Sequence, residues 1–262
     1  MLFLDEFTES AAMHTSYMYE PHPVFEAPSD PDAQLWRYMD FAKLVDLLES
    51  RSLFFSRADK LGDPFEGSYS EANLRLRPEM YGEHAAAVTE QLSQVMREMP
   101  RFTIINCWHL SDYESAAMWE KYSAAGYAIA IRSTFRRFTA SLMCEEKVYA
   151  GLVNYVDYAK DVIPESSTFY PFLHKRLSFQ HEREVRAIMQ AIPWGKDNTP
   201  EFEKDSWRAG RAVSVDLERL IEAIYVAPYA PDWFIPLVDR LQRRLDLSFD
   251  VRHSDLERDP VY

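Results

Sequence analysis

Two glutamates and an arginine stand at alternate positions in LSFQHEREVRAIM, residues 177–189. If this stretch forms one β-strand, Glu182, Glu184 and Arg186 share a face, and the apolar Val185, Ala187 and Met189 turn to a core. Charges on a covered sheet face are costly unless they are paired or used. Glu184 could hold a ribose hydroxyl and stabilise the positive charge that develops as a glycosidic bond loosens, with Glu182 orienting the acceptor. The alternative is a structural ion pair between Arg186 and one carboxylate on a solvated face.

Arg37 and Tyr38 form a second candidate group, at the end of a short strand predicted over residues 34–39. A guanidinium can bind a diphosphate or a carboxylate through two parallel hydrogen bonds. The ring of Tyr38 can stack on a base or on nicotinamide. Alternatively, Tyr38 packs in the core and Arg37 pairs with one of the many acidic residues.

The loop GDPFEG, residues 62–67, contains two glycines and could bring exposed backbone amides close to a ligand. It matches neither a P-loop nor a dinucleotide-binding fingerprint. Asp63 and Phe65 are its candidate ligand-binding residues. The alternative is a tight structural turn in which Asp63 caps the chain and Phe65 fills the core, because Asp-Pro is frequent in turns.

Cys107, His109 and Ser111 alternate at the end of another predicted strand, so they would share a face, as a nucleophile and its base must. No nucleophile-elbow sequence surrounds them, which disfavours a hydrolase. Trp119 lies in a short amphipathic helix and either packs in the core or forms the wall of a pocket. The spacing of histidines and cysteines fits no common zinc motif, so we expect no metal.

The composition limits the class of protein. The 262 residues carry a net charge of −13, which disfavours a general nucleic-acid coat or a binder of anionic membranes. A local basic patch remains an option, with Arg132, Arg136, Arg137 and Arg176 as its candidates. Two isolated cysteines, the absence of a signal-peptide pattern and the lack of a long apolar run predict a cytoplasmic protein with no membrane span.

The elements that must position these residues alternate in type along the chain. Strands are predicted at residues 34–39, 52–56, 102–108, 127–131, 177–189, 213–217, 222–227 and 247–251, with a bent strand or hairpin at 147–158. Helices are predicted after Asp40 and at 71–99, 115–122, 134–144, 169–175 and 232–245. We therefore expect a Pro-rich N-terminal arm over residues 1–34, followed by a single α+β domain over residues 35–262.

Three segments resemble a known family: residues 35–67 with the Asp-Pro-Phe loop, 107–131 with its Trp-Glu-Lys-Tyr helix, and 172–188 with Glu-x-Glu-x-Arg. They are similar to the bacterial domain-of-unknown-function 2971 family, over roughly residues 35–190. The family name carries no activity, but the resemblance suggests a phage-defence or toxin context.

The order of Arg37, Ser56 and Glu184 also resembles the ADP-ribosyltransferase fold, and Glu182–Glu184 is similar to the Glu-x-Glu signature of that superfamily. This resemblance implies a mixed, split β-sheet with flanking helices and NAD as the substrate. Arg37 would hold phosphate or ribose, Ser56 would line the site, Tyr38 or Phe65 would stack, and Glu184 would be catalytic. The chain departs from the pattern because Ser56 lacks a Ser-Thr-Ser run and lies only 18 residues beyond Arg37.

Three hypotheses follow for the function. The first is a nucleotide-binding enzyme that transfers ADP-ribose from NAD to a protein or nucleic-acid acceptor; in it, Glu184→Gln abolishes NAD turnover without lowering thermal stability. The second is a non-catalytic partner-binding or regulatory domain of a defence system, which uses the Pro-rich arm and the acidic surface. The third is an enzyme that acts on nucleic acid through the arginine patch.

Overall fold

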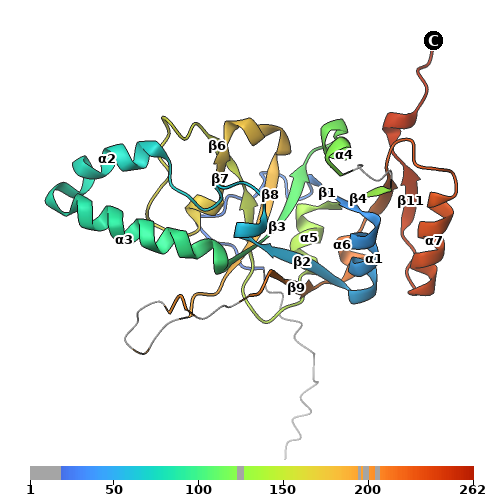
Figure 1. Cartoon of the computed structure of the whole chain (residues 1–262). Helices are drawn as coiled ribbons and strands as arrows, with labels where there is room; N and C mark the ends of the chain where they lie inside the picture. The colour runs from blue at the N-terminus through green and yellow to red at the C-terminus, as the bar shows by residue number, and fades with distance from the viewer. Residues whose placement is uncertain (1–18, 123–126, 194–195, 197–200, 204–206) are drawn as a thin grey trace, which may run out of the picture.

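The computed structural model describes residues 19–122, 127–193, 196, 201–203 and 207–262. These residues form an α+β fold with a mixed sheet flanked by helices, as the sequence predicts (Figure 1). The described residues build a nine-stranded sheet whose main path has the order β11-β10-β4-β1-β3-β2-β9. Its strands are β1 Gln34–Asp40, β2 Ser52–Arg57, β3 Thr103–Leu110, β4 Ala128–Thr134, β5 Tyr149–Leu152, β8 Glu184–Gln190, β9 Gly210–Ser214, β10 Ala223–Val226 and β11 Asp250–His253.

Strand β3 is the centre of this sheet because it pairs with three other strands. One edge of β3 pairs with β8 along its whole length, and β8 in turn pairs with β5. The other edge pairs with both β1 and β2. Only β10 and β11 are parallel neighbours within the described sheet, and a separate parallel pair is formed by β6 Asn154–Val156 and β7 His174–Arg176.

Helices cover both faces of the sheet. The larger apolar core lies between one face and α1 Phe41–Ser50, α5 Phe135–Ser141, α6 Leu217–Leu220 and α7 Phe234–Arg244. On the opposite face, α4 Ala116–Tyr122 packs on β1, β4 and β10. Further along this face, α3 Ala85–Glu98 packs on β3 and β8, and α2 Glu71–Tyr81 extends away from the sheet beside α3 (Figure 1). The second face therefore has two apolar clusters, and the charged residues of β8 lie between them.

Local chemistry explains where the first helix begins. The carboxylate of Asp40, the last residue of β1, accepts a hydrogen bond of 2.9 Å from the backbone amide of Lys43. This satisfies one of the free donors in the first turn of α1, so Asp40 is the N-cap of the helix predicted to follow it. The spacing of Leu44, Leu47 and Leu48 then buries one stripe of the helix.

The segment before β8 differs from the sequence-based expectation. The helix predicted at 169–175 is a single 3-10 turn, Tyr170–Phe172, because residues 174–176 pair with β6 as strand β7. The strand predicted from residue 177 begins only at Glu184, after a 3-10 segment over Leu177–Glu182 and a left-handed Arg183 with φ of 40°. Its partner β3 ends at Leu110, so residues before 183 have no neighbouring strand to extend the pairing.

The described part of the N-terminal arm lies against the domain. Tyr19 pairs with Val148, and the amide of Leu152 donates to the carbonyl of Glu26 at 2.8 Å. Phe25 is buried, and Gly151 lies directly under the arm, where a Cβ atom would come within 2.9 Å of the Glu26 carbonyl oxygen. Among the described residues, no helix is long and apolar enough to cross a membrane.

The two glycines of the 62–67 loop provide a test of how tightly this loop packs on the ring of Phe172. Gly67 has φ of 76°, and a Cβ there would overlap with the fully buried ring of Phe172. Gly67→Ala should therefore lower the free energy of unfolding by about 1–3 kcal/mol, measured by urea denaturation. Gly62→Ala is the matched control, because Gly62 also has a positive φ, of 88°, but no atom lies within 4 Å of its Cβ position. Equal losses in the two variants would contradict the packing argument.

Candidate functional site

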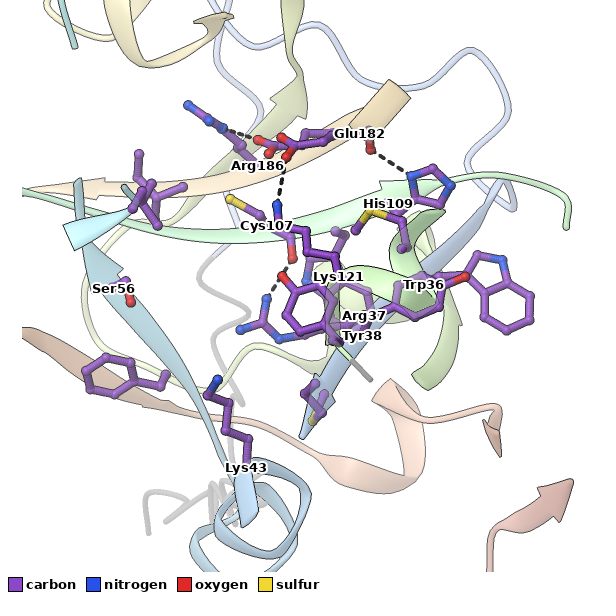
Figure 2. Close-up of a pocket in the computed structure, with 18 of the residues that line it drawn as sticks. Trp36, Arg37, Tyr38, Lys43, Ser56, Cys107, His109, Lys121, Glu182 and Arg186 are labelled. Atoms are coloured by element: carbon purple, nitrogen blue, oxygen red, sulfur yellow. Dashed lines mark hydrogen bonds and ion pairs between the residues drawn. The ribbon is translucent and has the colours of Figure 1, made fainter. Parts of the chain in front are cut away.

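The sheet divides at the edge of β3 that faces β1 and β2. Trp36 of β1 pairs with His109 near one end of β3, and Ser56 of β2 pairs with Ile105 near the other end. Between these points, residues 106–108 have no strand partner on that edge in the described part of the chain. A pocket of about 340 Å³ opens here, with β2 and Ser56 on one side and Arg37 and Tyr38 of β1 on the other (Figure 2).

Two side chains replace the backbone hydrogen bonds that are missing across this gap. Arg37 Nη1 donates to the carbonyl of Cys107 at 2.6 Å, and the side-chain amide of Asn106 donates to the carbonyl of Phe54 at 3.0 Å. Polar backbone groups that lose a strand partner need such substitutes. The gap is therefore stabilised as an opening in the sheet.

The register of β3 and β8 brings two groups of candidate residues together. His109 lies directly opposite Glu184, and Cys107 lies directly opposite Arg186. Opposite residues of antiparallel strands point to the same face with Cβ atoms about 5 Å apart. The glutamate strand and the Cys-His strand therefore form one floor of the pocket.

Arg186 is the buried centre of the charged cluster. Its Nε donates to Glu184 at 2.6 Å, and its Nη2 donates to Glu66 at 3.0 Å in a two-pronged contact that also includes Nη1. Nη1 also donates to the carbonyl of Phe172 at 2.6 Å. Arg186 is 1% exposed, so this arrangement is the structural ion pair considered above, placed in the interior with a second carboxylate.

Two lysines complete the cluster. Lys175 contacts Glu182 and donates to Glu184 at 2.9 Å, and Lys121 of α4 donates to Glu182 at 2.7 Å (Figure 2). Glu182 precedes β8, so it does not share a strand face with Glu184 as the alternating pattern predicted. The two carboxylates are close because both bind Lys175. Burial raises the pKa of Glu184, but the attraction of Arg186 and Lys175 outweighs it and holds the pKa below its usual range.

The charges of this cluster balance one another. Three carboxylates (Glu66, Glu182 and Glu184) meet three cations (Lys121, Lys175 and Arg186). Arg37 also lines the pocket, and within the described ranges it has no carboxylate partner. It lies 6.0 Å from the ring centroid of Trp108. Burial lowers the pKa of Arg37, but a guanidinium remains protonated at neutral pH.

Burial affects the protonation of both Cys107 and His109 of β3. Burial raises the pKa of Cys107 to about 12, so the residue is a thiol and not a thiolate at neutral pH. Burial lowers the pKa of His109, whose Nδ1 lies 2.7 Å from the main-chain oxygen of Glu182. A cysteine nucleophile is therefore disfavoured here, whereas His109 is a neutral base.

Eight of the residues singled out in the sequence line this pocket: Arg37, Tyr38, Ser56, Cys107, His109, Glu182, Glu184 and Arg186. Asp63, Phe65 and Trp119 lie outside its lining. Asp63 binds Arg176 at 2.8 Å and accepts the amide of Phe65, as the structural-turn alternative requires. Phe65 is 41% exposed and lies under Arg176, so it does not fill the core. Trp119 is buried and donates to Glu114.

Several residues of the cluster have no sequence signal of their own. Lys121, Lys175 and Glu66 lie far apart in the chain, and only the folded structure brings them to Glu182 and Arg186. Glu66 belongs to the 62–67 loop and Lys175 precedes the Glu-x-Glu, but their spacing does not predict contact. In the described part of the chain, no group of three or more His, Cys, Asp or Glu side chains is arranged to hold a metal ion.

The position of Glu184 changes the expectation for its substitution. Glu184→Gln leaves buried Lys175 and Arg186 short of a charge, and breaking such a pair costs about 3 kcal/mol or more. Because the folded-state pKa of Glu184 is low, its stabilisation is complete above the ordinary carboxyl pKa and is lost as pH falls toward the folded-state value.

The difference in free energy of unfolding between wild type and Glu184→Gln should therefore be large at pH 7 and shrink below about pH 4. Urea denaturation at several pH values measures it. Asp32→Asn removes a surface ion pair with Arg136 and should change stability far less at pH 7. A difference for Glu184→Gln that is the same at pH 3 and pH 7 would contradict the low pKa.

The chain was compared with protein-family models, with curated proteins and with solved structures, and no match was found in any of the three comparisons. The two resemblances suggested by the sequence therefore remain predictions. The function has to be argued from the geometry of the pocket.

Proposed function

We propose that the pocket between β1 and β2 binds a nucleotide of the NAD type, and that the protein is an ADP-ribosyltransferase-like enzyme that uses NAD as its substrate. The observation that carries this proposal is Arg37, a pocket cation that forms no ion pair with a carboxylate of the described residues. A diphosphate supplies the missing negative charge. The order Arg37, Ser56 and Glu184 around one pocket agrees with the resemblance noted in the sequence.

Arg37 has donors left for a ligand. Nη1 donates to the Cys107 carbonyl, which fixes the guanidinium in the gap. A guanidinium has five N–H donors in a planar fork, so it can bind a phosphate while it keeps this bond. Charge-assisted hydrogen bonds of this kind contribute about 1.5–3 kcal/mol each.

The aromatic part of the ligand would stack on residues other than the predicted Tyr38. The Tyr38 ring is 4% exposed and already contacts Trp36, Trp119 and Tyr122. Tyr122 of α4 and Phe54 of β2 also line the pocket, and both are more exposed than Tyr38. We therefore assign stacking to these two rings, which lie on elements at the two sides of the gap.

Glu184 would act on the ribose. Its low pKa keeps it ionised, and a carboxylate attracts an oxocarbenium-like centre more strongly as the positive charge develops. Lys175 and Arg186 offset part of this attraction and fix the orientation of the carboxylate. Glu182, bridged to the same Lys175, would orient the acceptor.

The nucleic-acid alternative has less support from the described residues. Arg132, Arg136 and Arg176 are paired with Glu222, Asp32 and Asp63, and Arg137 donates to the backbone carbonyls of Glu218 and Ile221. These arginines are therefore committed to internal contacts and do not form a free basic patch.

Binding tests the role of Arg37. Arg37→Ala should raise the Kd for NAD by about 10- to 100-fold, measured by calorimetry, because one charge-assisted contact is lost. Arg132→Ala is the matched control: Arg132 stacks over Trp36 from outside the pocket lining and should leave the Kd unchanged. An absence of NAD binding by the wild-type protein would refute the proposal and favour the partner-binding domain.

Turnover tests the role of Glu184. Glu184→Gln should abolish nicotinamide release from NAD, whereas Glu66→Gln should retain it. Glu66 binds the same buried Arg186 but lies outside the pocket lining, so it controls for damage to the ion network. Both variants are compared at a temperature where circular dichroism shows them folded. Full activity of Glu184→Gln, or equal losses in both variants, would contradict a catalytic role.

A further inference from the structure

We infer that His109 is the proton acceptor of this pocket, and that its Nε2 accepts a hydrogen bond from a hydroxyl group of the bound ligand. In the proposed transfer the hydroxyl that donates to Nε2 is the attacking hydroxyl or water itself, and Nε2 takes its proton. The catalytic part of this inference rests on the proposed function, whereas the hydrogen-bonding part requires only a hydroxyl-bearing ligand in the pocket.

The hydrogen bond at the other ring nitrogen fixes the tautomer. Nδ1 lies 2.7 Å from the main-chain oxygen of Glu182, and a carbonyl oxygen can only accept (Figure 2). Nδ1 therefore carries the proton. In a neutral imidazole the second nitrogen is then an acceptor. Burial lowers the pKa of His109, which keeps the ring neutral at physiological pH.

The turn before β8 holds this arrangement in place. Arg183 adopts the left-handed conformation, with φ of 40°, immediately after Glu182. Its carbonyl accepts the amide of Leu110 at 2.9 Å, so the turn is joined to the end of β3 that carries His109. A non-glycine residue in this conformation costs about 1 kcal/mol or more, and here it accompanies the placement of the Glu182 carbonyl at the ring.

Nε2 is the remaining polar atom of the ring. His109 lines the pocket, and none of the hydrogen bonds among the described residues involves its Nε2. The ring of Tyr38 packs against it edge-on at 6.2 Å and positions it. The titratable groups around the ring include His181, Glu182 and Arg183 of the turn, Glu184 and Arg186 of β8, Arg37 and Tyr38 of β1, Cys107 of β3, and Lys121 and Tyr122 of α4.

The proposed step balances as follows. The O–H bond of the attacking hydroxyl or water breaks, and its proton moves to Nε2 to form an imidazolium. The oxygen forms a bond to the anomeric carbon of the ribose. The bond from this carbon to nicotinamide breaks, and its electron pair leaves with neutral nicotinamide. The imidazolium then returns its proton to solvent. Glu184, directly opposite His109, would stabilise the ribose cation in the same step.

His109→Asn tests the acceptor role separately from a structural one. The asparagine amide can still donate to the Glu182 carbonyl, as Nδ1 does, but nothing replaces Nε2. We expect kcat for nicotinamide release to fall by about 10²- to 10⁴-fold with little change in KM. Wild-type activity should fall as pH drops through the pKa of His109, and the variant should lack this dependence.

His174→Asn is the matched control. His174 is also buried, its Nδ1 lies 2.7 Å from the carbonyl of Tyr170, and burial lowers its pKa too, but it lies outside the pocket lining. This variant should keep wild-type turnover. Wild-type activity of His109→Asn would overturn the catalytic part of the inference.

Nitrogen NMR of the histidine rings in the full chain tests the hydrogen-bonding part. The His109 signals, identified by their loss in His109→Asn, should show a protonated Nδ1 and a bare Nε2 at pH 7.5. ADP-ribose should shift the Nε2 signal. If ADP-ribose shifts the Nε2 signal but the wild-type protein releases no nicotinamide, the transferase proposal is refuted, and the role of Nε2 as a hydrogen-bond acceptor is supported. A protonated Nε2, or no shift with ADP-ribose, AMP or ribose 5-phosphate, would overturn the inference even if Arg37 binds NAD.

Discussion

The buried guanidinium of Arg186 is the interaction on which the candidate site depends. It joins three segments of the chain: the 62–67 loop through Glu66, the main-chain oxygen of Phe172, and Glu184 on β8. A buried cation is tolerated only when its donors are satisfied and its charge is matched. This requirement fixes the positions of all three segments at once. Glu184 is therefore oriented by the packing of the domain, before any ligand is present.

The divided edge of β3 supplies the space next to this fixed carboxylate. Strands β1 and β2 pair with the two ends of the same edge of β3, and the middle of that edge is left without a strand. Here the side chains of Arg37 and Asn106 bind two backbone carbonyls, of Cys107 and Phe54, at the opening where no strand pairing reaches them. Arg37 thus has a structural and a proposed ligand-binding role, and the two use different donors of one guanidinium.

Local patterns predicted the elements that local physics controls. The N-cap at Asp40, the strand over β1 and the shared face of Glu184 and Arg186 follow from capping chemistry and alternation. The 3-10 segment over Leu177–Glu182 was missed because the end of a strand is set by its neighbour, and β3 ends at Leu110. The pairing of Glu66 with Arg186 and of Lys175 with both glutamates depends on tertiary contact, for which one sequence contains no signal. For Tyr38 the sequence allowed two readings, because an aromatic residue near the end of a strand can contact a ligand or pack in the core. The structure places it in the core.

The N-terminal residues that cross Gly151 have a consequence for how the chain reaches this structure. Strand β5 has β8 on one side, and residues 19–26 lie on its other side through Tyr19–Val148 and Glu26–Leu152. These residues leave the ribosome more than 120 residues before the residues that they pair with. Until then, the arm has no docking site, and afterwards it blocks the outer row of β5 hydrogen-bonding groups from recruiting a strand of another molecule. Residues 19–26 therefore cover a sheet edge to which a strand of another molecule could otherwise add.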